Sequence, residues 1–164
     1  MTDRLILPLR VLLVLVFAGL IVAEVLSLPG QFLSDAADAP EGFRPVYWVL
    51  LVFAILEVLA LQVVIVCVWR LLTLIRRDRI FSEQSFRWVD AIAWTIGLAW
   101  VLLAGVAVFL VSVLYFTPQL RDPGTPILLI GMTLIGAVVA LVVLVLRALL
   151  RQAASQRAEL EEVI

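Results

Sequence analysis

The stretch that decides the fold is AIAWTIGLAWVLLAGVAVFLVSVLYF, residues 91–116, which contains no charged side chain. It is longer than the about 20 apolar residues that a helix needs to cross a hydrocarbon core of about 30 Å. The whole chain agrees, because 65% of its residues are hydrophobic and only 15% are charged. A soluble core of this size could not hide that much apolar surface, so lipid must be the solvent for much of it.

Three further segments meet the same test, at residues 8–28, 46–69 and 126–146. An open sheet would leave unpaired edges in lipid, and the alternation that a membrane barrel requires is missing. The first segment has the Arg-containing start of a signal peptide, but it lacks an A-x-A cleavage pattern. The sequence therefore predicts an all-α fold: one transmembrane domain over residues 1–164, built as a four-helix bundle.

The arginines predict the orientation, because ten of the twelve lie before the first span, between the second and third, or after the fourth. The ten are Arg4, Arg10, Arg70, Arg76, Arg77, Arg79, Arg87, Arg147, Arg151 and Arg157. The positive-inside rule places these residues, and with them both termini, in the cytoplasm. We therefore expect a multi-pass protein of the bacterial inner membrane, with helical extensions in the connection 70–90 and the tail 147–164.

The connections carry local signals of their own. Ser82 is a suitable N-cap for a helix that starts at Glu83, and Glu83 suits the positive end of that helix dipole. On the other side of the membrane, the stretch from Pro29 to Pro45 contains Gly, Pro and acidic residues, which predicts an exposed irregular loop. The connection 117–125 is short, so neither outer loop can fold as a domain.

Small residues recur at a spacing of four in three of the spans. The pairs are Gly19 with Ala23, Ala93 with Gly97, and Gly136 with Ala140. Such pairs let helix backbones approach closely. They fit a packed bundle and a homo-oligomer equally well.

Glu57 is the sharpest candidate for a site inside the membrane. It lies about 16 Å along its span, near mid-bilayer, where a charge costs from about 3 to well over 10 kcal/mol. The neutral acid needs a hydrogen-bond partner, and Thr133 is at a comparable depth on the fourth span. Gln62 lies about 140° around the helix, so it is expected to make its own interhelical contact. Glu57 and Gln62 either hold helices together or form a proton-coupled or ligand-binding site.

Glu24 lies near the outer end of the first predicted span. It is expected to pair with Arg44 or Arg121, or to accept a hydrogen bond from Ser112 at a similar depth. An outward-facing site that uses Glu24 together with Glu57 is the alternative. The depths of these two carboxylates are expected to differ by about 10 Å.

Composition excludes much familiar chemistry. The chain has no His, which removes the commonest metal ligand and the usual proton shuttle near neutral pH. Cys67 is the only cysteine, so an internal disulfide or a multi-cysteine metal site cannot form. No phosphate-binding Gly-rich loop or nucleophile–base pair is visible. The sequence therefore predicts neither an enzyme nor a bound cofactor, and the net charge of −1 suggests no direct nucleic-acid partner.

The cytoplasmic face is the second candidate site, because a chain without a bulky extramembrane domain must present helices and short loops to a partner. The candidate partner surface consists of Arg76, Arg77, Arg79, Phe81, Ser82, Glu83, Arg151, Arg157, Glu161 and Glu162. Its basic part would also attract anionic lipid headgroups.

Two short motifs resemble a known family. Ile80-Phe81-Ser82-Glu83 lies in the one sizeable cytoplasmic connection, and the tail ends in Arg157-Ala-Glu159-Leu160-Glu161-Glu162-Val163-Ile164. These features resemble the bacterial four-span membrane proteins called domain of unknown function two-nine-seven-five. Relatives often have Asn after the Phe-Ser pair, where this chain has Gln84 nearby. The resemblance implies a cytoplasmic partner, since members are often encoded beside a very small helix-turn-helix regulator.

Three hypotheses follow. The first is a non-enzymatic regulatory or interaction protein whose cytoplasmic face binds a partner such as that regulator. The second is a small proton-coupled transporter or channel subunit that uses Glu57. The third is an accessory subunit of a larger membrane complex.

Overall fold

A computed structural model describes residues 2–75, 83–117 and 124–162, and every regular element in these ranges is helical. The elements are α1 (Thr2–Val22), the π-helical η1 (Ala23–Ser27), α2 (Leu28–Asp38), the 3-10 helix η2 (Glu41–Phe43), α3 (Arg44–Ile75), α4 (Glu83–Phe116) and α5 (Gly124–Glu162). Four stretches are long and apolar enough to cross a membrane: Leu7–Asp38, Arg44–Leu74, Ser85–Phe116 and Gly124–Gln156. The chain is therefore a multi-pass transmembrane helical bundle, as the sequence predicted.

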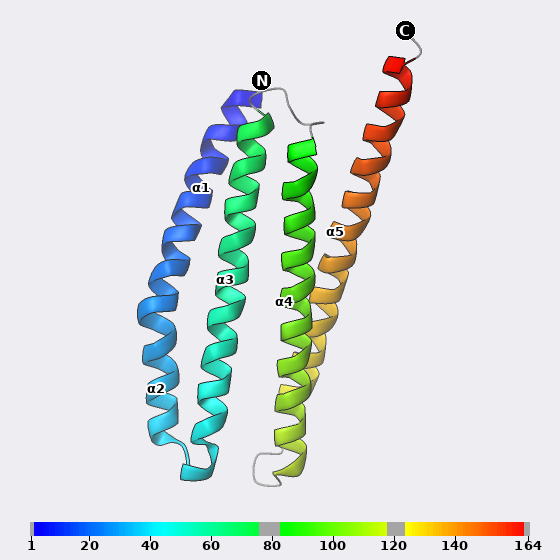
Figure 1. Ribbon diagram of the computed structural model, residues 1–164. Helices are drawn as coiled ribbons and strands as arrows, with labels where there is room; N and C mark the ends of the chain where they lie inside the picture. The colour runs from blue at the N-terminus through cyan, green and yellow to red at the C-terminus, as the bar shows by residue number, and fades with distance from the viewer. Residues whose placement is uncertain (1, 76–82, 118–123, 163–164) are drawn as a thin grey trace.

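The helices stand side by side in chain order, and both termini lie at the same end of the bundle (Figure 1). α3 packs against α1, α2 and α4, and α5 packs against α4. Towards its C-terminus α5 inclines away from α4 (Figure 1). The architecture is thus two antiparallel hairpins joined through the contact between α3 and α4.

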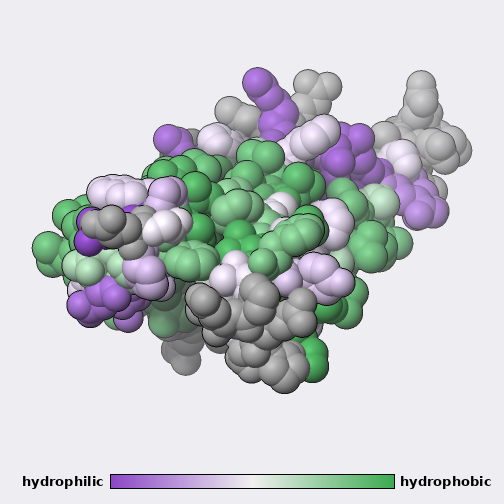
Figure 2. Space-filling view, turned by 90° about the horizontal axis from the view of Figure 1, so that it is seen from below, coloured by the Kyte–Doolittle hydropathy of each residue, from purple (hydrophilic) through white to green (hydrophobic). Residues whose placement is uncertain are grey.

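The interior is small and the outer surface is apolar. Among the described residues, the buried apolar side chains are Ala36, Leu51, Cys67, Leu72, Ala93 and Ala107. Large apolar side chains point outward along every span, for example Leu15, Leu61, Leu98 and Leu141. Viewed along the helix axes, hydrophobic residues cover much of the bundle and hydrophilic residues gather towards its periphery (Figure 2). The outward-pointing apolar side chains of the spans are stable when lipid surrounds the helices.

The first span is longer than predicted, and the expected irregular loop from Pro29 to Pro45 is wrong over most of its length. Helix continues to Asp38, and only the short stretch through η2 connects it to α3. The reason is the π-helical turn η1, in which the N–H of Leu28 bonds to the carbonyl of Ala23. Pro29 follows in the first turn of α2, and the helix continues past it although proline has no N–H to donate.

Seven arginines of the described helices lie at the end of the bundle that holds both termini, here called the Arg-rich end. They are Arg4 and Arg10 on α1, Arg70 on α3, Arg87 on α4, and Arg147, Arg151 and Arg157 on α5. Arg44 opens α3 at the opposite end. The structure describes α4 from Glu83 onward, and the predicted N-cap Ser82 lies outside the described residues.

Candidate functional site

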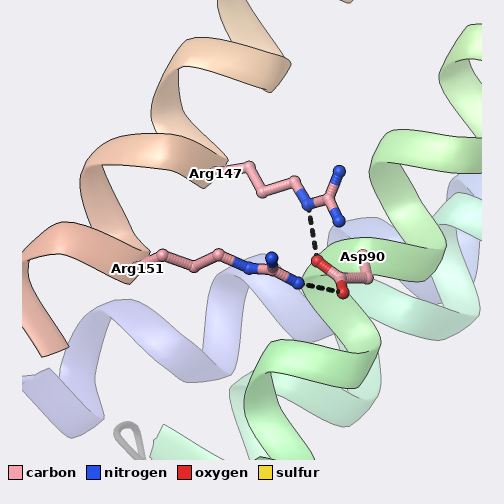
Figure 3. A network of polar contacts seen from close by, with 3 residues as sticks. All are labelled: Asp90, Arg147 and Arg151. Atoms are coloured by element: carbon pink, nitrogen blue, oxygen red, sulfur yellow. Dashed lines mark hydrogen bonds and ion pairs between the residues drawn. The ribbon is translucent and has the colours of Figure 1, made fainter. Parts of the chain in front are cut away.

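A carboxylate on α4 holds two arginines of α5 at the Arg-rich end (Figure 3). Arg147 Nε donates to Asp90 Oδ1 and Arg151 Nη2 donates to Asp90 Oδ2, each at 2.6 Å. The arginines are four residues apart, so they project from one face of α5 on successive turns. The side chains of Asp90 and Arg147 are 28% and 25% exposed, whereas that of Arg151 is 55% exposed. These charge-assisted bonds fix the register of α5 against α4.

The other helix pairs also have arginine contacts at this end. Arg10 Nη2 donates to Thr73 Oγ1 at 3.2 Å, and its guanidinium carbon lies 5.5 Å from the centroid of the Trp69 ring. These contacts join α1 to α3. The guanidinium of Arg70 lies 5.8 Å from the centroid of the Trp88 ring and joins α3 to α4. Cation–π contacts at this distance are attractive, so arginine side chains link all four spans at one level.

The crevice between α4 and α5 contains two hollows. The one beside Asp90 has a volume of about 450 Å³ and is lined by Phe86, Arg87, Asp90, Arg151 and Ala154. The other has a volume of about 490 Å³ and an almost wholly apolar lining, which includes Trp94, Gly97, Trp100, Ala137, Ala140 and Leu144. The first can hold a polar group and the second a hydrocarbon.

Most of the predicted partner surface falls outside the residues that the structure describes. Arg76, Arg77, Arg79, Phe81 and Ser82 lie in the undescribed stretch 76–82. Glu83 lies on α4, and Arg157, Glu161 and Glu162 lie on α5, but the placement of their side chains is not described. Arg151 is the member whose contacts are visible, and it bonds to Asp90.

Glu24 lies deeper than predicted. Because helix continues to Asp38, Glu24 is about 21 Å from that end of the first span, at a depth comparable to that of Glu57. Its partner is Gln62, whose Nε2 donates to Glu24 Oε2 at 2.8 Å. The predicted donor Ser112 instead bonds to the carbonyl of Val108, and Arg121 lies outside the described residues. Glu24 is part of the π-helical turn η1, a feature that often accompanies function.

Glu57 keeps one oxygen without a partner. Its Oε1 is buried and, in the part of the chain that the structure describes, accepts no hydrogen bond. The predicted partner Thr133 is wrong, because its hydroxyl bonds to the carbonyl of Leu129 on its own helix. Thr133 belongs to α5, which packs against α4 and not chiefly against α3, the helix of Glu57. Glu57 and Gln62 lie five residues apart on α3, about 7.5 Å along its axis.

The Trp100 side chain of α4 packs closely against α5 near Thr133. Trp100 Nε1 donates to the carbonyl oxygen of Thr133 at 3.0 Å. A Cβ atom added to Gly136 would lie 3.1 Å from Trp100 Cδ1 and 3.5 Å from Leu103 Cδ2. Gly136 therefore provides the space for the indole ring, which is a side-chain contact and not the close backbone approach that the small-residue spacing predicted. Gly19 and Gly97 have no such neighbour within 4 Å.

The profile of the family described as "Protein of unknown function (DUF2975)" matches residues 31–164. The chain belongs to this family. No curated protein and no solved structure matches the chain. The DUF2975 match confirms the resemblance that the Phe81-Ser82 motif and the tail suggested. It includes α3, α4 and α5, and so Glu57, Gln62 and the whole Asp90 cluster, whereas Glu24 precedes it.

Asp90 is the residue of this DUF2975 chain that sequence reasoning missed. It directly precedes the charge-free stretch 91–116, so the pattern marks it only as the boundary of a span. The available signal was the spacing of four between Arg147 and Arg151, which puts two guanidinium groups on one face at a span end. Such a pair predicts an acidic partner at the same level on a neighbouring helix.

Proposed function

We propose that this DUF2975 protein is a non-enzymatic interaction protein of the bacterial inner membrane, which docks a cytoplasmic regulator on its Arg-rich end. The observation that carries the proposal is the continuation of α5 as helix to Glu162. The segment after Arg147 is about 22 Å long. It leaves the apolar span at Arg147 and Arg151, where Asp90 fixes its direction. A helix anchored in this way presents a defined surface to a partner.

The chemistry of that helix suggests the class of partner. It carries Arg151 and Arg157 and ends in the acidic run from Glu159 to Glu162. An acidic helix end is complementary to a basic DNA-binding protein. A small helix-turn-helix regulator, the partner that the family resemblance implies, has that chemistry.

Orientation is part of the proposal, since a cytoplasmic regulator can reach only a cytoplasmic face. Ten of twelve arginines support a cytoplasmic Arg-rich end with both termini inside. The single cysteine, Cys67, is buried. Cysteines added at either terminus can therefore be labelled against a low background in intact cells. An impermeant maleimide should label neither terminus until the cells are permeabilised, and labelling of intact cells would refute the orientation.

The partner is tested by affinity purification of the tagged full-length chain from native membranes. A small helix-turn-helix protein should co-purify in a stoichiometric amount, and neutralising Glu159, Glu161 and Glu162 to Gln should abolish its recovery. The matched control neutralises Asp35 and Asp38 at the opposite end of the bundle and should leave recovery unchanged. Equal recovery with both variants, or no such protein, would refute the proposal. Recovery only within a larger integral complex would favour an accessory subunit.

A second candidate function rests on the partnerless oxygen of Glu57. A buried acid without a hydrogen bond, at the depth of the Glu24–Gln62 pair, suits a proton-coupled transporter or channel subunit. Proton flux into liposomes that the wild type supports and Glu57→Gln abolishes would support this function. If neither protein conducts protons, the candidate fails.

A further inference from the structure

The crevice between α4 and α5 has the two parts of an amphiphile-binding site. Arg87, Asp90 and Arg151 line the hollow at the Arg-rich end. Trp94 and Leu144 line the apolar groove. Trp94 follows Asp90 by four residues on α4, and Leu144 precedes Arg151 by seven on α5, which are axial separations of about 6 and 10 Å. The polar hollow and the apolar groove therefore adjoin along the same pair of helices.

The polar hollow carries an excess of positive charge. Arg87 and Arg151 line it together with one carboxylate, that of Asp90, which also accepts a bond from Arg147 beside the hollow. Each guanidinium has five N–H donors, and the bonds to Asp90 use one donor of Arg147 and one of Arg151. Both side chains extend from α5 towards α4, so Asp90 holds their guanidinium groups in place (Figure 3). Arginines arranged in this way are suited to a phosphate group, which accepts several charge-assisted bonds.

The groove below the hollow suits a hydrocarbon chain. Gly97, Ala137 and Ala140 lie on facing helices and leave the space that larger side chains would fill. Trp94 lies between groove and hollow and is 75% exposed. An indole ring favours the level of the lipid headgroups. The sequence of features along the crevice is thus basic, amphipathic and apolar, the same order as in a phospholipid.

We propose that this crevice binds one anionic diacyl phospholipid, with its phosphate on Arg151 and Arg87, assisted by Arg147 from across Asp90, and one acyl chain in the groove. Charge complementarity selects the anionic headgroup, and the continuous apolar groove selects a lipid over a soluble phosphate. The site does not depend on the proposed regulator, because its lining ends at Ala154 and does not include the acidic run from Glu159 to Glu162.

Native mass spectrometry of the purified full-length protein with phosphatidylglycerol and phosphatidylcholine tests the site. Wild type should retain phosphatidylglycerol in preference to phosphatidylcholine. In the double variant Arg147→Gln/Arg151→Gln, the ratio of retained phosphatidylglycerol to phosphatidylcholine should fall about tenfold. Arg10→Gln/Arg70→Gln removes two positive charges from the same end on other helices and should keep the preference. Ala140→Leu fills the groove without changing charge and should reduce retention of phosphatidylglycerol.

The outcomes separate the explanations. Unchanged preference in Arg147→Gln/Arg151→Gln, or equal loss in the control pair, would overturn the site and indicate diffuse surface electrostatics. Displacement of the lipid by millimolar inorganic phosphate, or full retention in Ala140→Leu, would overturn the lipid assignment in favour of a soluble anion. Circular dichroism and size exclusion check that each variant is folded, and a misfolded Ala140→Leu is replaced by Gly97→Leu, which fills the same groove from α4.

Discussion

Replacing Gly136 with alanine should destabilise the contact between α4 and α5, although alanine is the better helix former. The added Cβ would lie 3.1 Å from Trp100 Cδ1, so the indole must move. That movement disturbs the bond from Trp100 Nε1 to the carbonyl of Thr133, which is 3.0 Å long. Loss of a hydrogen bond within the membrane costs about 0.6–1.7 kcal/mol. A side chain forced off its rotamer adds about 0.5–1.5 kcal/mol.

Gly131 provides the matched control, since it lies on the same helix and has no atom within 4 Å of an added Cβ. The intrinsic gain from Gly to Ala, about 1 kcal/mol in a helix interior, is common to both positions and cancels in the comparison. Gly136→Ala should therefore unfold about 1–2 kcal/mol more easily than Gly131→Ala.

The assay is reversible unfolding in mixed micelles of a mild detergent and dodecyl sulfate, followed by tryptophan fluorescence and circular dichroism. The mole fraction of dodecyl sulfate at the midpoint should fall for Gly136→Ala relative to Gly131→Ala. Equal midpoints, or a higher midpoint for Gly136→Ala, would show that the indole adapts freely and that this approach does not hold the helices together.

Three further outcomes can be measured in the same way. Asp90→Asn should lower the free energy of unfolding by about 1 kcal/mol, a modest loss because Arg151 is more than half exposed. The double variant Asp90→Asn/Arg147→Gln should lose less than the sum of the two single changes, because both remove the same ion pair. Glu24→Leu should lower the free energy of unfolding by about 1 kcal/mol, because it leaves the Gln62 amide without its acceptor. Glu24→Gln keeps an amide oxygen that can accept this bond, so its stability should be close to that of the wild type. Glu57→Leu should be as stable as wild type or more so, because it replaces a buried oxygen that lacks a partner; a clear loss of stability would reveal a structural bond to Glu57.

Local pattern was sufficient for the elements whose signals are local. The length of each apolar stretch, compared with the thickness of the bilayer, predicted the four long apolar helices that the structure shows. The same kind of reasoning failed at Pro29, because a proline normally ends a helix. The π-helical turn before it, which depends on the backbone of five residues together, lets the helix continue.

The amino-acid sequence by itself determined that the chain is helical, that four of its described helices are long and apolar enough to cross a membrane, and that it belongs to its family. These properties follow from the length of the apolar stretches and from short motifs, both of which are local features of the sequence. Only the tertiary structure decided which polar groups meet: Glu24 with Gln62, Asp90 with two arginines, and Trp100 with the backbone of α5. Each of these contacts depends on how far one helix is rotated and shifted against the next, and side-chain packing sets both quantities.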